Sequence, residues 1–443
     1  MIKNVKNKKA TVLGAARSGI AAAKLLKAMD ADVFVSDYAE KDVIPELEEF
    51  GIAYESGMHS QRVFEADFVI LSPGISRQTP IVKELTAKNI PVYSEIEAAY
   101  WFCKSPVIGI TGSNGKTTTT TLIGEMLKTK YSDVIVAGNI GKPFSSFVQN
   151  SREDSMAVVE LSSFQLETID TFRPRMAVAL NFAPNHLDWY ETFEEYKTAK
   201  WRITKNLRED DLLIYNADDE ELVVRSRSLN CRKRSFSVKN ADKAEANYRD
   251  GKLWLEGKTI IGVEEMPIRG MHNYMNALAA SLAAADAGIE LTMIAETLRK
   301  FEGVEHRLEF VKEINGVKYY NDSKATTVES LWYALKSFTA PIVLIAGGKD
   351  KGSDFSKLDD LIAERVKEVV LIGKAAKKMK DTWKDIKPLR TVANLKSAVE
   401  TAAEIAHKGD VVLLSPACAS FDMFKDFEDR GKKFKEIVNH LAG

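Results

Sequence analysis

Short apolar runs typical of buried strands alternate with helical patterns along nearly the whole chain of 443 residues. This alternation predicts α/β domains with largely parallel sheets. At about 150 residues for each domain, the length fits three domains. The strand-like runs are residues 10–14, 32–37, 67–72, 91–95, 106–110, 134–139, 157–162, 176–182, 211–217, 317–323, 341–348, 368–373 and 410–417.

Changes in this pattern predict domain boundaries near residues 97 and 304. In the segment YRDGKLWLEGKTIIG, the pair Asp250-Gly251 predicts a hairpin turn. A helix is expected to follow from about Asn273 to near Gly288. The predicted domains are a Rossmann-like N-terminal domain at 1–97, a central phosphate-loop ATPase-type parallel sheet at 98–303 and a Rossmann-like C-terminal domain at 304–443.

Charge and cysteine usage restrict the setting of the protein. Lys and Arg total 62 against 63 Asp and Glu, so no basic field favours nucleic acid, and we expect no such partner. Cys103, Cys231 and Cys418 are too far apart for metal-ligand spacing, which favours a reduced cytosolic compartment. The sequence has neither a signal peptide nor an apolar run of about 18 residues. We expect a cytoplasmic monomer without a membrane span.

The segment VIGITGSNGKTTTT predicts a nucleotide site. Gly115, Lys116 and Thr117 give the G-K-T ending of a phosphate loop, but Ile110 stands where the usual pattern has a glycine. A helix that begins near Gly115 offers free N–H groups and a positive dipole end. Gly112 allows the backbone to approach phosphate oxygens closely, Lys116 can reach the terminal phosphates, and Thr117 can ligate magnesium. The alternative is a strand–helix turn without a ligand.

The short loop T-G-S-N-G-K-T-T resembles that of the Mur ligase superfamily, which also includes folylpolyglutamate synthetases. Enzymes of this family couple a carboxylate to an amine with ATP. Other stretches resemble family blocks in the family order and cover nearly the whole chain. They are VVELSSFQLE (158–167), NFAPNHLDWY (181–190), YKTAKWRI (196–203), HNYMNALAA (272–280), EHRLEF (305–310), YNDSKATT (320–327) and SPACASFDMFKDFEDRG (415–431).

Within the superfamily, these blocks resemble the members that join D-glutamate to UDP-N-acetylmuramoyl-L-alanine in peptidoglycan precursor synthesis. The resemblance therefore implies these two small-molecule substrates, ATP, two Mg²⁺ ions, an acyl-phosphate intermediate, and ADP and phosphate as products. The muramate–L-alanine ligases are the nearest alternative, because they share a dinucleotide-type first domain. They carry His where this loop has Asn114.

Two residues that follow strands of the central block are candidate metal ligands. Glu160 ends an apolar strand, and a carboxylate at that edge beside a phosphate loop suits magnesium. His186 follows the next strand in a loop. A strand-end acid in water and a solvated surface histidine are the alternatives. The resemblance makes Glu160 a metal ligand and assigns His186 to the second magnesium ion.

Lys200 lies in a predicted helix whose start is marked by the capping-box pair Thr192 and Glu195. Its position alone predicts a surface lysine. The resemblance implies instead that carbon dioxide carbamylates Lys200, which turns a cation into an anionic oxygen ligand for the second magnesium ion. The implied metal ligands are Thr117, Glu160, His186 and Lys200, and the implied catalytic residues are Lys116, Glu160, His186 and Lys200.

A second glycine turn, GAARSG at 14–19, follows the first strand as a degenerate dinucleotide fingerprint. Asp37 ends the next strand, where a ribose-binding acid would lie. A nicotinamide site, a site for the uridine diphosphate end of a sugar nucleotide, and a tight turn without a ligand are the alternatives. The resemblance favours the sugar nucleotide. The substrate contacts that it implies are Ala15, Asp37, Ser72, Gly74 and Asn139.

In the third block, Asp322, Lys324 and Thr326 follow a strand end, where alternate side chains can face one cleft. A polar strand exit in water is the alternative. The resemblance implies ATP contacts at Gly112, Ser113, Asn114, Gly115, Lys116, Thr117, Thr118, Asn273, Asn276, Arg307 and Asp322, although the two asparagines of the helix at 273 could equally cap it. It implies a D-glutamate pocket of Lys324, Thr326, Lys351, Ser420, Phe421 and Phe427.

Two function classes compete with a ligase. A nicotinamide oxidoreductase would use the turn at 14–19 but leaves the loop at 112–118 and Glu160 without a role. A nucleotide-switched binding protein would use the phosphate loop but leaves the YNDSKATT and SPACAS blocks without one. A ligase releases phosphate from ATP only when both substrates are present, which separates the three.

Overall fold

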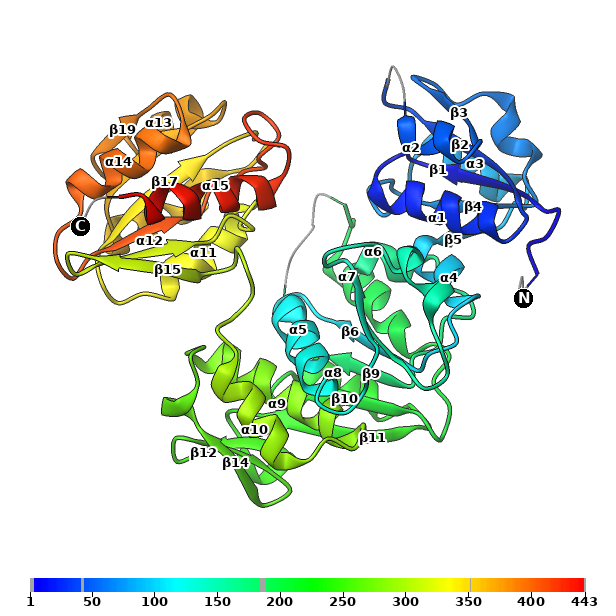
Figure 1. The fold of residues 1–443 in the computed structure, drawn as a ribbon, viewed down its shortest axis with the longest axis horizontal. Helices are drawn as coiled ribbons and strands as arrows, with labels where there is room; N and C mark the ends of the chain where they lie inside the picture. Colours follow the sequence, from blue (N-terminus) through cyan, green and yellow to red (C-terminus); the bar gives the residue numbers. More distant parts are fainter. Residues whose placement is uncertain (1–3, 41–43, 184–188, 351, 442–443) are drawn as a thin grey trace. The chain divides into compact units, whose positions relative to one another are not determined.

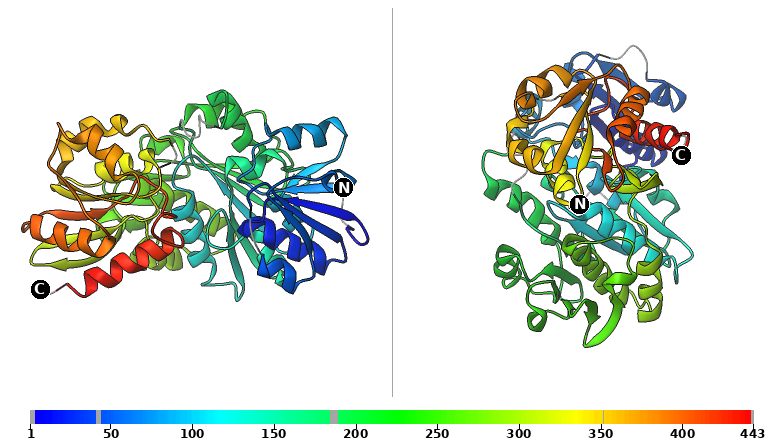
Figure 2. Two further views of the ribbon diagram at one scale, coloured as in Figure 1. Left: turned by 90° about the horizontal axis from the view of Figure 1, so that it is seen from above. Right: turned by 90° about the vertical axis from the view of Figure 1, so that its left-hand side faces the viewer.

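The computed structural model describes residues 4–40, 44–183, 189–350 and 352–441. The chain forms two compact units, Met1–Phe301 and Glu302–Gly443. The first unit holds a five-stranded and a nine-stranded sheet, and the second holds a six-stranded sheet (Figures 1 and 2). The α/β class and the three sheets predicted from the sequence are confirmed.

The N-terminal sheet has the strand order β3-β2-β1-β4-β5, and all its pairings are parallel. The order reverses between β1 and β4, which creates a switch point where loops diverge and ligands bind. Apolar residues of β1, β2 and β4 pack against α1 in one core. The strands are β1 (Lys9–Leu13), β2 (Asp32–Asp37), β3 (Ala53–Ser56), β4 (Phe68–Leu71) and β5 (Val92–Ser94), with helices α1 (Arg17–Ala28), α2 (Pro45–Glu49), α3 (Pro80–Ala87) and α4 (Glu95–Tyr100).

The central sheet has the order β14-β13-β12-β11-β10-β9-β6-β8-β7. It is parallel from β7 to β12, and β12, β13 and β14 form an antiparallel meander. The strands are β6 (Val107–Thr111), β7 (Val134–Gly138), β8 (Met156–Glu160), β9 (Met176–Ala179), β10 (Leu212–Asn216), β11 (Arg232–Ser237), β12 (Ala246–Arg249), β13 (Lys252–Leu255) and β14 (Lys258–Gly262). The helices are α5 (Lys116–Leu127), α6 (Ser163–Glu167), α7 (Phe193–Trp201), α8 (Glu220–Ser226), α9 (Met271–Asp286) and α10 (Leu291–Lys300).

The predicted hairpin and helix at the end of this unit are both present. Asp250 and Gly251 have φ of 50° and 72° and join β12 to its antiparallel partner β13, as a tight hairpin turn requires. Helix α9 begins at Met271, slightly before the expected start, and ends at Asp286. Its alanine-rich second half is buried and packs against the sheet and α5.

The sheet of the second unit has the order β15-β16-β20-β17-β18-β19. Only the β15–β16 pair is antiparallel among the described strands. Two apolar cores cover its two faces, one around Trp383 and one around Phe434. The strands are β15 (Glu309–Ile314), β16 (Val317–Asn321), β17 (Ile342–Gly347), β18 (Val366–Ile372), β19 (Leu389–Thr391) and β20 (Val411–Leu414), with helices α11 (Val328–Lys336), α12 (Asp359–Arg365), α13 (Ala376–Trp383), α14 (Leu395–Ile405) and α15 (Phe427–Asn439).

Candidate active site

The predicted phosphate loop joins β6 to α5, and helix α5 begins at Lys116. Gly115 caps the helix in the left-handed region, at φ 83°. A Cβ on Gly115 would overlap the Asn276 amide, and one on Gly112 would lie 2.9 Å from the Leu180 Cβ. The two glycines are therefore required for the backbone path and for the close packing of the loop.

The segment after β9 holds the phosphate loop in place. The Asn181 carbonyl accepts from the Ser113 N–H at 3.0 Å, and the Asn181 amide binds both the N–H and the carbonyl of Asn114, at 2.9 and 3.2 Å. The Ser113 hydroxyl donates to the Ala183 carbonyl and accepts from the Ala183 N–H, at 2.9 Å each. It also accepts from the Tyr196 hydroxyl at 3.1 Å. With these groups engaged, the first-turn N–H groups of α5 are the natural phosphate donors.

Lys116 folds its ammonium group back over this loop. Its Nζ donates to the carbonyl oxygens of Gly112 and Ser113 at 2.9 and 3.0 Å. The side chain is half-buried in the first turn of α5. A cation held there lies beside the helix N-terminus, where phosphate groups bind.

Lys200 of α7 reaches the same carbonyl oxygen from another part of the chain. Its Nζ donates to Gly112 O at 2.9 Å and lies 4.6 Å from the centroid of the Tyr196 ring. The residue is only 2% exposed, so the surface position that the helix pattern alone predicts is wrong. Burial, and then the charge of Lys116, lower the pKa of Lys200 well below its ordinary value, while Glu160 opposes the shift. Burial therefore makes the charged form of Lys200 less favourable than it is in water.

The start of α7 follows the predicted capping signal only in part. The Thr192 hydroxyl accepts from the Glu195 N–H at 3.2 Å. The Glu195 carboxylate accepts from the Glu191 N–H at 3.1 Å. In a reciprocal capping box, Glu195 would accept from the N–H of Thr192 itself, but here it accepts from the N–H of the preceding residue.

Glu160 ends β8 at the edge of the sheet from which the phosphate loop leaves. It pairs in register with Ile110 of β6 and is 1% exposed. Its Oε1 accepts from the Asn139 side-chain amide at 2.8 Å, and the Asn139 N–H donates to the Glu160 carbonyl at 2.9 Å. Glu160, a predicted metal ligand, is thus hydrogen-bonded to Asn139, which is predicted to bind the sugar nucleotide.

The oxygen ligands near the loop suit a magnesium ion whose coordination shell is completed by phosphate oxygens. No group of three His, Cys, Asp or Glu side chains that could hold a metal occurs among the described residues. Magnesium takes one or two protein carboxylates and fills its remaining positions with phosphate oxygens and water. Glu160 and the buried Thr117 of the first turn of α5 fit this pattern.

Asn276 and Asn273 lie on the helix that packs against α5. Asn276 is 5% exposed, and its Oδ1 accepts from the Thr119 hydroxyl at 3.4 Å. Its amide donates to Asn273 Oδ1 at 3.4 Å, and Asn273 donates to the Arg269 carbonyl at 2.9 Å. The pair therefore joins α9 to the start of α5, beside the loop that the sequence assigns to ATP.

Apart from Asn139, the predicted sugar-nucleotide residues meet at the switch point of the N-terminal sheet. The Ala15 N–H donates to Asp37 Oδ2 at 2.8 Å, and the Ser72 hydroxyl donates to the Gly14 carbonyl at 3.0 Å. Gly74 is exposed and follows Ser72 in the same loop. Ala15, Asp37, Ser72 and Gly74 thus belong to one group of loops at the carboxyl ends of β1, β2 and β4.

In the second unit, Asp322 joins the exits of β16 and β20. Its Oδ2 accepts from the Ser415 hydroxyl at 2.7 Å, and its Oδ1 accepts from the Leu308 N–H at 3.2 Å. Burial raises the pKa of Asp322 to about 7, although the Ser415 hydrogen bond and the charge of Arg307 oppose the shift. The predicted ATP residues Arg307 and Asp322 therefore interact with each other.

The residues assigned to the amino-acid pocket lie on neighbouring loops of the same unit. Lys324 Nζ is 5.9 Å from the centroid of the Phe427 ring. The Thr326 N–H donates to the Lys324 carbonyl at 2.9 Å. Ser420 is buried after β20, and Phe421 beside it is 64% exposed. Two other predicted residues, His186 and Lys351, lie outside the described residues.

Three family models match the chain in order. The MurD N-terminal domain matches residues 9–81, the Mur ligase middle domain matches 110–284, and the Mur ligase glutamate ligase domain matches 306–418. The UDP-N-acetylmuramoylalanine–D-glutamate ligases of Salinibacter ruber and Chloroherpeton thalassium are 42% and 44% identical to the chain. Each alignment covers 99% of both proteins.

The chain belongs to the UDP-N-acetylmuramoylalanine–D-glutamate ligase family. The Mur ligase resemblance and the ligase class inferred from the sequence are therefore confirmed. Solved Mur ligases share the fold. The UDP-N-acetylmuramate–alanine ligase of Thermotoga maritima superposes with a TM-score of 0.63 at 20% identity, over 98% of this chain and 99% of that one. A MurF ligase of Thermotoga maritima in complex with ADP gives 0.60 at 16% identity, over 99% and 97%.

The sequence analysis missed several side chains that hold the loops of the candidate site. Asn181 and Tyr196 hold the phosphate loop, and Ser415 binds Asp322. Ser323 and Arg430 join two loops of the second unit. All of them lie inside blocks that resemble the Mur ligases, but their partners are remote in sequence, so spacing gave no signal for their roles.

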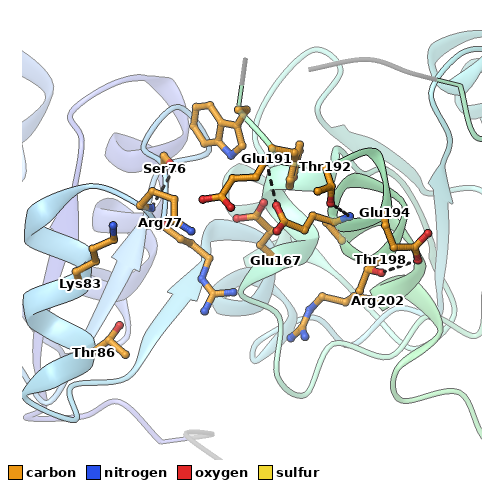
Figure 3. A pocket seen from close by; sticks show the side chains of 15 residues that line it. Ser76, Arg77, Lys83, Thr86, Glu167, Glu191, Thr192, Glu194, Thr198 and Arg202 are labelled. Atoms are coloured by element: carbon orange, nitrogen blue, oxygen red, sulfur yellow. Dashed lines mark hydrogen bonds between the residues drawn. The ribbon is translucent and has the colours of Figure 1, made fainter. Parts of the chain in front are cut away.

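The first unit also contains a cavity of about 600 Å³. Figure 3 shows Lys83 and Arg77 on the N-terminal side of this cavity, and Glu167 and Arg202 on the side of the central sheet. The lining as described includes none of the predicted site residues. It consists of Ser76, Arg77, Gln78, Lys83, Thr86, Glu167, Trp189, Tyr190, Glu191, Thr192, Glu194, Glu195, Thr198, Ala199 and Arg202. In the part of the chain that is described, no helix is long and apolar enough to cross a membrane.

Proposed function

We propose that the protein adds D-glutamate to UDP-N-acetylmuramoyl-L-alanine with ATP and releases ADP and phosphate. One observation carries the proposal beyond the family: Lys116 and Lys200 share the carbonyl of Gly112 at the sheet edge where the carboxylate of Glu160 is buried. Two lysine side chains, a carboxylate and a helix N-terminus at one place can stabilise the negative charge that shifts between oxygen atoms when a carboxylate attacks a phosphate.

The reaction requires activation because a carboxylate is a poor electrophile. Transfer of the γ-phosphate to the substrate carboxylate gives an acyl phosphate with a good leaving group. Lys116 and the first-turn N–H groups of α5 offset the negative charge of the phosphates, and the Asn181 contacts hold the loop in shape for this task. The D-glutamate amine then attacks the acyl carbon, and the tetrahedral intermediate expels phosphate.

Two magnesium ions would be held by Thr117, Glu160, His186 and a carbamylated Lys200. Magnesium bound there reduces the repulsion between the substrate carboxylate and the phosphates. Lys200 suits carbamylation because its burial favours the uncharged amine, which is the nucleophilic form. The amine nitrogen forms a bond to the carbon of carbon dioxide and releases a proton, which leaves an anionic carbamate.

The remaining site residues divide between the substrates. Most of them lie on loops at strand exits, which supports this assignment. The proposal also includes domains at 1–97, 98–303 and 304–443 and a cytoplasmic monomer. Ala15, Asp37, Ser72, Gly74 and Asn139 bind the sugar nucleotide. Gly112, Ser113, Asn114, Gly115, Thr118, Asn273, Asn276, Arg307 and Asp322 bind ATP with Lys116 and Thr117. Lys324, Thr326, Lys351, Ser420, Phe421 and Phe427 bind D-glutamate.

The decisive experiment measures phosphate release from ATP with UDP-N-acetylmuramoyl-L-alanine and a series of amino acids. D-Glutamate is expected to support turnover, and L-alanine, L-glutamate and L-lysine are not. Omission of either substrate abolishes steady phosphate release. Equal turnover with L-lysine, or with no amino acid, contradicts the proposal.

A further inference from the structure

A fully buried arginine joins two of the loops to which the amino-acid pocket is assigned. Arg430 of α15 is 0% exposed. Its Nε donates to the Ser323 hydroxyl at 2.9 Å, and its Nη2 donates to the Ser323 carbonyl at 2.8 Å. Nη1 and Nη2 both donate to the Cys418 carbonyl at 3.2 Å. Ser323 directly precedes Lys324 after β16, and Cys418 lies shortly before Ser420 after β20.

The contacts of this arginine differ from those of an ordinary buried ion pair. Within the described part of the chain, its hydrogen-bond acceptors are one hydroxyl and two backbone carbonyls, and none is a carboxylate. Burial lowers the pKa of Arg430 to about 10, so the group stays protonated at neutral pH. Burying a guanidinium without a bonded carboxylate is costly. Holding two backbone carbonyls in a fixed relation is what the planar fork provides.

The partners of Arg430 extend the same connection to further pocket segments. The Ser323 hydroxyl donates to the Phe427 carbonyl at 2.8 Å. Ala419, the residue after Cys418, pairs with Lys349 after β17 through hydrogen bonds of 2.8 and 3.2 Å. A Cβ on Gly348 would overlap the Ala419 carbonyl, so the exits of β17 and β20 lie in close contact. Arg430 thus binds the segments that follow β16 and β20 directly, and its partners connect these segments to the exit of β17 and the start of α15.

We propose that Arg430 is the positioning residue of the amino-acid pocket. Its fork fixes the exit of β16 against the exit of β20, and thereby holds Lys324 and Ser420 at the spacing that a dicarboxylic amino acid requires. This inference rests on the proposed function, because that function assigns these two residues to D-glutamate. A displaced donor weakens the binding of a carboxylate strongly, since charged hydrogen bonds depend on geometry.

The test compares the steady-state kinetics of Arg430→Lys with those of the wild type. Lysine keeps a cation but cannot make the planar fork. The KM for D-glutamate is expected to rise about ten- to a hundredfold, as for the loss of a charged hydrogen bond, while the KM for UDP-N-acetylmuramoyl-L-alanine stays the same. Saturating D-glutamate restores kcat to within a few-fold. Ser323→Ala, which removes one acceptor of the fork, shifts the KM for D-glutamate in the same direction by a few-fold.

Phe434→Leu is the matched control, because Phe434 lies one turn further along α15, is 0% exposed and packs in the core on one face of the sheet. A purely structural role predicts that both α15 variants lower the melting temperature and leave the KM for D-glutamate unchanged. That result for Arg430→Lys overturns the inference. An unchanged KM in Ser323→Ala overturns it as well, even where Arg430→Lys does not fold. A wild-type protein that shows no D-glutamate-dependent phosphate release instead contradicts the proposed function.

Discussion

The first unit contains two turns of the same construction, in which a strand runs through glycine into a helix. In the turn from β1 to α1, the Ala15 N–H is bound by Asp37, and the helix begins with the exposed Arg17. In the turn from β6 to α5, Asn181 binds the Asn114 backbone, and the helix begins with the half-buried Lys116. The two turns share the strand–glycine–helix backbone path, but different polar groups surround them.

The glycines of the two turns also serve different needs. A Cβ on Gly19 would overlap the carbonyl of Gly14, so this glycine allows α1 to pack closely on the end of β1. Gly115 is required for a left-handed backbone directly before the first helical N–H groups. A glycine pattern therefore indicates a tight turn in both places. The second turn differs in the side chains that other elements bring to it, because Lys200 of α7 donates to the Gly112 carbonyl and Glu160 of β8 ends at the same sheet edge.

The largest expected effect separates the two helix starts. Lys116→Ala removes the cation beside the phosphates and is expected to lower kcat on the order of 10³-fold, the upper range for loss of one preorganised electrostatic contact. Arg17→Ala makes the same change at the first residue of α1 and is expected to leave kcat within a few-fold. Steady-state phosphate release measures both. A Lys116→Ala enzyme within a few-fold of wild type shows that this loop does not hold the phosphates.

The next effect concerns the lysine that only the second turn receives. Lys200→Ala is expected to lower the rate on the order of 10²-fold, and acetate is expected to restore part of it, because its carboxylate replaces the carbamate oxygens. A lysine that acts through positive charge predicts the opposite, with Lys200→Arg active and acetate without effect. The measurement is ligase rate against acetate concentration at constant ionic strength. An active Lys200→Arg enzyme contradicts the carbamate.

A smaller effect tests the hydrogen bonds that hold each turn. Asn181→Ala removes both hydrogen bonds to the half-buried Asn114 backbone and is expected to raise the KM for ATP about tenfold, as for the loss of one or two hydrogen bonds. Asp37→Ala releases the Ala15 N–H of the other turn and is expected to raise the KM for the sugar nucleotide instead. Initial rates with each substrate varied separate the two. If Asn181→Ala leaves the KM for ATP unchanged, the phosphate loop keeps its shape without the Asn181 hydrogen bonds.

The same contrast explains what could be predicted from the sequence. Strands, turns and the G-K-T loop are local, so β6 and the start of α5 were found within a residue or two. Strand β11, with the sequence RKRSFS, was missed because its basic start hides the pattern of a buried strand, although it pairs with β10 and β12. Strands β3, β15 and β19 were also missed, since each is short or polar and lies at a sheet edge.

The long-range part of the site could not be predicted. Asn181 binds a residue 67 positions away, and Arg430 binds one 107 positions away, so no spacing rule connects them. The burial of Lys200 depends on how α7 docks on the loop. Phe193 and Tyr196 form an apolar stripe that marks one face of this helix, and Lys200 lies four residues after Tyr196, but a lysine at that position gives no sign that it is buried with them. Only the family resemblance pointed to Lys200. His186 and Lys351 remain predictions, because they lie outside the described residues.

The smallest expected effect is on stability and again depends on Lys200. Burial and the charge of Lys116 lower its pKa in the folded protein well below 10.5, with Glu160 opposing the shift. The unfolded chain keeps this proton up to about pH 10.5. Between the two pKa values the unfolded state binds one proton more, so the free energy of unfolding rises with pH through this window. Lys200→Met is expected to lose that rise in buffer free of carbon dioxide.

Urea unfolding from about pH 8 to pH 10, followed through tryptophan fluorescence, measures this slope. Carbon dioxide must be excluded, because a carbamylated Lys200 no longer titrates as an amine. Arg17→Met, which removes the exposed cation from the other turn, is expected to keep the wild-type slope. Equal slopes in the wild type and Lys200→Met would mean that folding leaves the proton on Lys200. The uncharged amine needed for carbamylation would then not be the resting state of the site, although the phosphate loop itself would be unaffected.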